Sequence, residues 1–218
     1  MNDDSDAVLR VGARVPVTRA EGPGARYALW LQGCTIRCPG CCNPHLFEAS
    51  GGDQLPVTSL LADVAAVRDE VEGITMLGGE PFDQTEGLAP FARGVRGLGL
   101  SVMIFTGHTL DELRSRHDPV TEALLATTDL LVDGRYEASH LEGERLWVGS
   151  SNQRFHYLTE RYAPAVERPG PHEPLRTVEV RIGPEGRLSA NGWPDIGRHE
   201  QRSSGVSLGA PTRSGRSR

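Results

Sequence analysis

Residues 30–43 read WLQGCTIRCPGCCN and place Cys34, Cys38 and Cys41 in a C-x3-C-x2-C spacing directly after an apolar, strand-like segment. Three thiolates on one short loop can reach a single metal centre. A [4Fe–4S] cluster needs a ligand for each of its four irons, usually a cysteine thiolate, so three cysteines leave one iron open to a substrate or cofactor. The spacing therefore favours a catalytic iron–sulfur cluster.

Other interpretations of these cysteines stay open. Together with His45, the three residues match a tetrahedral Cys3His zinc site, although structural zinc sites usually draw on two separated pairs of ligands. Disulfides are the weakest alternative, because the N-terminus MNDDSDAV lacks the apolar core of a secretory signal. We therefore expect a reducing, cytoplasmic setting. The fourth cysteine, Cys42, is expected to be a small buried hydrophobe and not a ligand.

A second motif follows at residues 74–83, ITMLGGEPFD, where an apolar run stops at Gly78, Gly79, Glu80 and Pro81. Such a run before paired glycines is typical of a buried parallel strand that ends in a tight turn. Glycines allow the backbone to approach a ligand closely, Glu80 supplies an anion, and Pro81 stiffens the turn. Taken alone, this GGEP turn is more typical of an ordinary strand-to-helix loop.

Together, the cysteine spacing and the GGEP turn resemble the radical S-adenosylmethionine (radical SAM) enzymes. Residues 21–43, EGPGARYALWLQGCTIRCPGCCN, look like the N-terminal signature of enzymes that activate glycyl-radical enzymes. Three later blocks occur in the order and approximate spacing of one branch, the activating proteins of anaerobic ribonucleoside-triphosphate reductase. These blocks are IFTGHTLDEL (104–113), LLVDGRY (130–136) and RLWVGSSNQRF (145–155).

The resemblance implies that the first three cysteines of the loop hold a [4Fe–4S] cluster, with the amino and carboxylate groups of SAM on its fourth iron. The backbone of the GGEP turn is then expected to receive the amino end. Thr106, Asp133 and Arg135 are candidates for the remaining polar contacts. Arg135 suits the methionine carboxylate because a guanidinium pairs with carboxylates bidentately, and an ordinary surface arginine is an equal alternative.

The resemblance also implies a reaction and partners. An electron from a small donor such as flavodoxin or ferredoxin cleaves SAM to a 5′-deoxyadenosyl radical, which removes hydrogen from a glycine Cα of a partner glycyl-radical enzyme. Within the superfamily, the alternative is a radical SAM enzyme that modifies a peptide or a small molecule. A non-catalytic metal-binding module is the alternative from another class.

Composition excludes several other classes. The chain has 218 residues, a net charge of −6 and a pI near 5.7, so it carries no footprint of a nucleic-acid binder. We expect no membrane span, because no apolar segment is long enough to cross a bilayer. All 23 basic residues are Arg, and a chain without Lys has neither Schiff-base chemistry nor a P-loop lysine.

The order of elements predicts an α/β fold. Apolar runs predict strands and amphipathic stretches predict helices, and their alternation favours parallel βαβ units. The strands are expected at 7–18, 26–32, 73–77, 101–105 and 129–133, and the helices at 57–72, 84–98, 109–116 and 119–127. The resemblance implies a partial (β/α)6-type barrel, open on one side, with its site at the C-terminal ends of the strands.

The C-terminal sixty residues have a different character. Residues 178–194 alternate like a β-hairpin with its turn at 183–186, and the last stretch is rich in Ser, Gly and Arg, which predicts disorder. We expect a radical SAM core at 1–160, a linker and hairpin at 161–196, and a disordered tail at 197–218.

Overall fold

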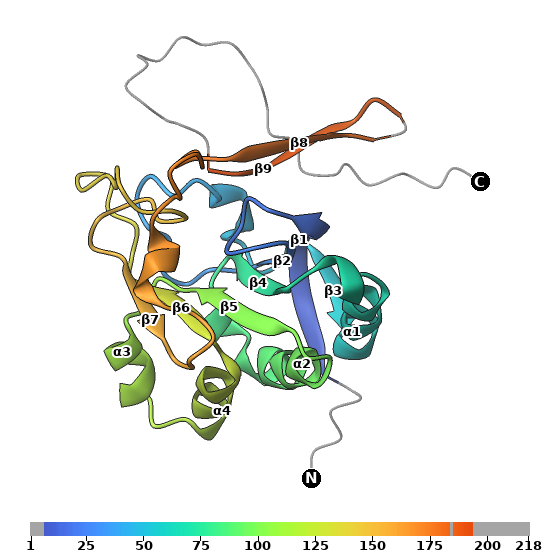
Figure 1. Ribbon diagram of the computed structural model, residues 1–218. Helices are drawn as coiled ribbons and strands as arrows, with labels where there is room; N and C mark the ends of the chain where they lie inside the picture. The colour runs from blue at the N-terminus through green and yellow to red at the C-terminus, as the bar shows by residue number, and fades with distance from the viewer. Residues whose placement is uncertain (1–6, 184, 194–218) are drawn as a thin grey trace.

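The structure is a computed structural model that describes residues 7–183 and 185–193. It contains a seven-stranded sheet in the order β3-β1-β2-β4-β5-β6-β7 and a separate hairpin, β8-β9, that lies on the opposite side of the sheet from the helices (Figure 1). The strands are β1 (Val8–Thr18), β2 (Arg26–Leu31), β3 (Asp53–Pro56), β4 (Gly73–Gly78), β5 (Ser101–Phe105), β6 (Leu130–Asp133), β7 (Arg154–Tyr157), β8 (Val178–Ile182) and β9 (Leu188–Gly192).

Four parallel strands, β2, β4, β5 and β6, form the centre of the sheet. Successive side chains of a strand point to opposite faces. In β2, Tyr27 and Leu29 pack into the core on the helix side, whereas Ala28 and Trp30 pack on the other side. Burial on both faces explains why these strands are nearly continuous apolar runs. The mixed α/β fold expected from the sequence is confirmed.

Four helices cover one face of the sheet (Figure 1). Local signals explain where two of them begin. Thr109 and Glu112 form a capping box at the start of α3, and Asp118 caps α4 ahead of a proline at the first helical position. The helices are α1 (Val57–Ala66), α2 (Thr85–Gly97), α3 (Leu110–Ser115) and α4 (Pro119–Thr127).

The helix predicted at 57–72 is longer than the helix that forms there, α1. α1 ends at Ala66, Val67 has a non-helical φ of −113°, and the chain continues as a 3-10 turn, Arg68–Glu70. Val71 beyond this turn is still buried. The apolar periodicity therefore runs past the true end of the helix, and it misled the prediction.

The outer strands do not belong to parallel βαβ units. β1 pairs antiparallel with both β2 and β3, and β7 pairs antiparallel with β6. The short strands β3 and β7 were not predicted, because their sequences DQLP and RFHY contain no apolar run. β3 and β7 end the order of hydrogen-bonded strands, so the sheet of the described residues is open.

The hairpin predicted at 178–194 is confirmed over the residues that the structure describes. Its polar face bonds to the main sheet: the Asn191 side-chain amide donates to Thr18 Oγ1 at 2.9 Å. At its base, the Trp193 ring lies 6.1 Å from the Phe105 ring, measured between centroids. The hairpin is thus attached to the face of the sheet that the helices leave uncovered.

The tail predicted at 197–218 lies outside the described residues, and the division of the chain at 160 and 196 stays a prediction. Across the described part of the chain, the helices are all too short or too polar to cross a membrane.

Candidate functional site

The loops after β2, β4, β5 and β6 meet at the C-terminal ends of these parallel strands. Backbone hydrogen bonds join two neighbouring pairs of these strand ends: the Gly79 N–H donates to Leu31 O at 2.8 Å, and the Thr106 N–H donates to Val132 O at 2.9 Å. Parallel pairing of the four strands confirms that their loops open at the same end of the sheet.

The cysteine loop, residues 33–43, carries the three predicted ligands, and each of their side chains is half-buried. Each sulfur also faces a backbone N–H group. The donors are Ile36 and Arg37 for Cys34, Tyr136 for Cys38, and Asn43 for Cys41, the last at 3.4 Å. Hydrogen bonds to sulfur are among the features that tune iron–sulfur clusters.

The start of the cysteine loop is held by a returning segment of the chain. The Gly33 N–H donates to Leu46 O at 2.8 Å, and the Cys34 N–H donates to Phe47 O at 3.1 Å. Farther along, Arg37 adopts a left-handed φ of 51°, which is unfavourable for a residue with a side chain. Such strained residues persist where the surrounding structure fixes them, often at functional sites.

The thiols differ in acidity. The Cys42 thiol donates a hydrogen bond to the Cys41 sulfur, which lowers the pKa of Cys41 to about 6 and raises the pKa of Cys42. Burial raises the pKa of Cys34 and of Cys38, and the backbone N–H groups offset part of that effect. Cys42 is exposed, so the expectation that it is a buried hydrophobe was wrong.

The donor set of the loop fits a [4Fe–4S] cluster, because three sulfurs with N–H donors lie on one short, partly shielded segment. A zinc site instead needs four ligands around one ion. Within residues 7–183 and 185–193, no three Cys, His, Asp or Glu side chains, the three predicted cysteine ligands included, are already arranged to hold a metal ion. The proposed fourth zinc ligand, His45, is exposed.

The GGEP turn packs backbone against backbone on the start of the cysteine loop. Gly78 has a φ of +105°, which favours glycine. A Cβ on Gly79 would lie 2.1 Å from Gly33 O and 3.0 Å from Leu31 O. The Glu80 N–H donates to the same Gly33 O at 2.8 Å. The two motifs singled out in the sequence are therefore in direct contact.

Glu80 ties the GGEP turn to the loop after β5. Its carboxylate is 2% exposed and accepts hydrogen bonds from Thr106 Oγ1 (2.7 Å), the Gly107 N–H (2.9 Å) and the Phe82 N–H (2.9 Å). Burial raises the pKa of Glu80 to about 7, although the three donors oppose the shift. Pro81 follows as the first residue of a 3-10 turn. The structure thus brings Glu80 and Thr106 together.

Asp133 and Arg135 have partners within the protein. The buried Asp133 carboxylate accepts the Leu110 N–H at 2.6 Å, and His156 Nε2 lies 2.8 Å from the same oxygen. Arg135 is half-exposed and pairs with Glu112 at 3.2 Å. The contacts to a cofactor that were expected for both residues stay predictions.

Sequence reasoning missed the residues that hold the cysteine loop from the side. Asp83 accepts two hydrogen bonds from Thr35, one from the backbone N–H (2.8 Å) and one from Oγ1 (3.0 Å). The Gln84 side-chain amide donates to Gln32 O at 2.9 Å. An Asp just before a helix is usually interpreted as a helix cap. The only available signal was therefore ambiguous.

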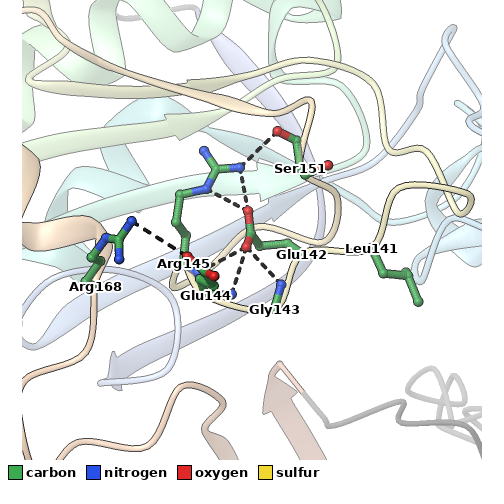
Figure 2. Close-up of a pocket in the computed structure, with 7 residues that line it drawn as sticks. All are labelled: Leu141, Glu142, Gly143, Glu144, Arg145, Ser151 and Arg168. Atoms are coloured by element: carbon green, nitrogen blue, oxygen red, sulfur yellow. Dashed lines mark hydrogen bonds and ion pairs between the residues drawn. The ribbon is translucent and has the colours of Figure 1, made fainter.

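An open hollow of about 650 Å³ lies on the loop between β6 and β7 (Figure 2). Its charges are already paired: Arg145 bonds to the Glu142 carboxylate at 2.6 Å, and Arg168 lies 3.7 Å from Glu144. The Glu142 carboxylate also accepts backbone N–H groups of its own loop. The hollow contains none of the predicted site residues.

Comparison with known proteins agrees with this geometry. A family model described as "4Fe-4S single cluster domain" matches residues 20–156. Similar relatives are named anaerobic ribonucleoside-triphosphate reductase-activating protein. They include proteins from Haemophilus influenzae (31% identical over 148 residues, 65% of this chain and 93% of the relative), Escherichia coli K12 (30% over 152 residues, 66% and 95%) and Enterobacteria phage T4 (27% over 146 residues, 64% and 88%). The chain therefore belongs to the 4Fe-4S single cluster domain family and, within it, to the family of anaerobic ribonucleoside-triphosphate reductase-activating proteins.

Proposed function

We propose that this chain is a radical SAM enzyme that generates a glycyl radical on an anaerobic ribonucleoside-triphosphate reductase. The observation that carries the proposal is the contact between the cysteine loop and the GGEP turn at the C-terminal ends of parallel strands. It occurs in a chain whose relatives are named as activating proteins of that reductase.

In this proposal, Cys34, Cys38 and Cys41 hold three irons of a [4Fe–4S] cluster, and the fourth iron is left for SAM. The N–H groups that face the three sulfurs support the assignment, because they stabilise thiolates. Cys42 acts as a hydrogen-bond donor to Cys41 and is not itself a ligand.

The GGEP turn supplies the acceptors for the amino end of SAM. The N–H groups of Gly79 and Glu80 are already bonded to Leu31 and Gly33, and an amino group donates hydrogen bonds. We therefore assign the amino end to backbone carbonyls of the turn. The Glu80 carboxylate and Thr106 fix the shape of the turn through their mutual hydrogen bond.

Of the remaining candidates, Arg135 is better placed than Asp133. Arg135 is half-exposed, and its positive charge acts on the Cys38 thiol, whose pKa it lowers. It can exchange its exposed pairing with Glu112 for the methionine carboxylate of SAM. The Asp133 carboxylate points to the helix side of the sheet, where it bonds to the first residue of α3. We assign Asp133 the role of holding that loop in place.

When bound, the cluster would pass on one electron from a small donor such as flavodoxin or ferredoxin for the reductive cleavage of SAM to methionine and a 5′-deoxyadenosyl radical. That radical would take hydrogen from a glycine Cα of the reductase. The protein positions the reactants and shields them.

We further propose that the open seven-stranded sheet is a partial barrel of the radical SAM type, and that its open side admits the glycine-bearing segment of the reductase. A reducing cytoplasm would suit the free thiolates.

The test uses protein reconstituted anaerobically with iron and sulfide, reduced, and supplied with SAM. Production of 5′-deoxyadenosine is expected from wild type and is expected to disappear when any one of the three ligand cysteines is replaced by Ala. A colourless protein that binds zinc through the same cysteines would favour a non-catalytic metal-binding module and would overturn the proposal.

A further inference from the structure

We propose that Asp83 is a positioning residue for the cysteine loop: its carboxylate clasps Thr35, the residue after the first ligand, and holds the loop in the shape that retains the cluster. This inference rests on the cluster assignment of the proposed function. It adds a residue outside the ligand set and outside the GGEP turn.

The clasp uses both oxygens of one carboxylate. Asp83 Oδ2 accepts the Thr35 N–H at 2.8 Å, and Asp83 Oδ1 accepts Thr35 Oγ1 at 3.0 Å. A bidentate arrangement fixes the direction of the bonded backbone as well as its distance, and hydrogen bonds to a charged acceptor are stronger than neutral ones. The orientation of Thr35 determines where the chain leaves Cys34 on its way to the second ligand.

Asp83 is itself held firmly. It closes the 3-10 turn Pro81–Asp83, and its N–H donates to Glu80 O at 3.1 Å. The neighbouring Phe82 is 3% exposed and anchors the turn in the core. A carboxylate on such a turn can impose its position on a surface loop, whereas the loop cannot easily displace the turn.

The negative charge of Asp83 does not explain why this residue would help the loop to retain a cluster, so its role is to position Thr35. A [4Fe–4S] cluster bound by three thiolates is an anionic centre, and a carboxylate near Cys34 adds a like charge. By electrostatics alone, removal of Asp83 would favour the loaded protein. The contact between Asp83 and Thr35 predicts instead that removal of Asp83 weakens iron binding, so one experiment separates the electrostatic effect from the positioning effect.

The experiment measures how fast the reconstituted wild-type protein and its variants lose iron to a ferrous-iron chelator under anaerobic conditions, without SAM and without the reductase. Asp83→Ala is expected to lose iron about tenfold faster than wild type, because both charge-assisted bonds are gone. Thr35→Val keeps the N–H bond and is expected to lose iron about threefold faster. Asp83→Asn keeps the shape and one acceptor, so it is expected to rescue most of the effect.

Asp69→Ala is the matched control. Asp69 is an exposed carboxylate in the turn before β4, at the opposite end of that strand from the cysteine loop. Its loss removes the same charge and is expected to leave the rate of iron loss unchanged. The double variant Asp83→Ala with Thr35→Val is expected to match Asp83→Ala, since the two changes break the same contact.

Iron loss from Asp83→Ala at or below the wild-type rate would overturn the clasp. If Asp83→Ala does not fold, Thr35→Val tests the same contact, and a wild-type rate of iron loss from that variant would also overturn the clasp. Failure of the cluster assignment has a separate signature, because Cys41→Ala would then retain the wild-type iron content.

Discussion

Replacement of Gly79 by Ala tests how closely the GGEP turn packs on the cysteine loop. The added Cβ would lie 2.1 Å from Gly33 O and 2.9 Å from Gly33 C, and Cβ atoms essentially never approach other heavy atoms within 3.0 Å. Both obstructing atoms belong to the backbone, so no side-chain rotation can relieve the clash. The turn must move away from the cysteine loop by roughly 1 Å.

That movement weakens two backbone hydrogen bonds of 2.8 Å, from the Gly79 N–H to Leu31 O and from the Glu80 N–H to Gly33 O. Each such bond contributes about 1 kcal/mol, and overpacking costs about 1–3 kcal/mol. The free energy of unfolding of Gly79→Ala is therefore expected to fall by about 3 kcal/mol.

Guanidinium denaturation of the metal-free protein, followed by circular dichroism, measures this change. Gly97→Ala serves as the control, because Gly97 ends α2 and nothing lies within 4 Å of its added Cβ. Its free energy of unfolding is expected to stay within about 1 kcal/mol of wild type or to rise. A wild-type free energy of unfolding for Gly79→Ala would refute the close packing of the two motifs.

Three further predictions concern single side chains. Burial raises the pKa of Glu80 to about 7, above its ordinary value of 4.5. As the pH rises, the unfolded chain therefore loses this proton before the folded chain does. The free energy of unfolding then falls as the pH rises between these two pKa values. Denaturation series at several pH values compare wild type with Glu80→Gln. Over this pH range, the free energy of unfolding of wild type is expected to fall by on the order of 3 kcal/mol more than that of Glu80→Gln, and parallel pH profiles of the two proteins would contradict this. Cys42→Ala is expected to keep its iron and sulfide while Cys41→Ala loses them, and the reverse pattern in the iron and sulfide assays would exclude the ligand assignment. Asp129→Asn removes the negative charge that pairs with Arg96 at 2.7 Å, and Asp129 is fully buried. Because Arg96 is partly exposed, the expected loss in the free energy of unfolding is only about 2 kcal/mol. A wild-type denaturation midpoint would refute this prediction.

The centre of the fold could be predicted because its strands are buried on both faces. Residues 74–77, ITML, are continuous and apolar, and they become the core of β4. The edge strands could not be predicted in this way. β3 and β7 form by pairing with β1 and β6, a tertiary effect that leaves no apolar pattern in DQLP or RFHY.

The candidate site could be proposed from the sequence where chemistry requires a fixed spacing. Three cysteines and paired glycines stand out in a sequence because few other arrangements serve the same purpose. The clasp between Asp83 and Thr35 carried no such signal, since a single carboxylate and a single hydroxyl 48 residues apart are common in any chain. Only the folded structure brings them together.

The most direct test of the proposed function is electron paramagnetic resonance of an anaerobic ribonucleoside-triphosphate reductase after incubation with this protein, a one-electron reductant and SAM. We expect a doublet signal from a stable glycyl radical on the reductase, formed together with 5′-deoxyadenosine and absent with the Cys38→Ala variant. If 5′-deoxyadenosine forms while the reductase stays without a radical and a peptide or small molecule is altered instead, the proposed activity is contradicted.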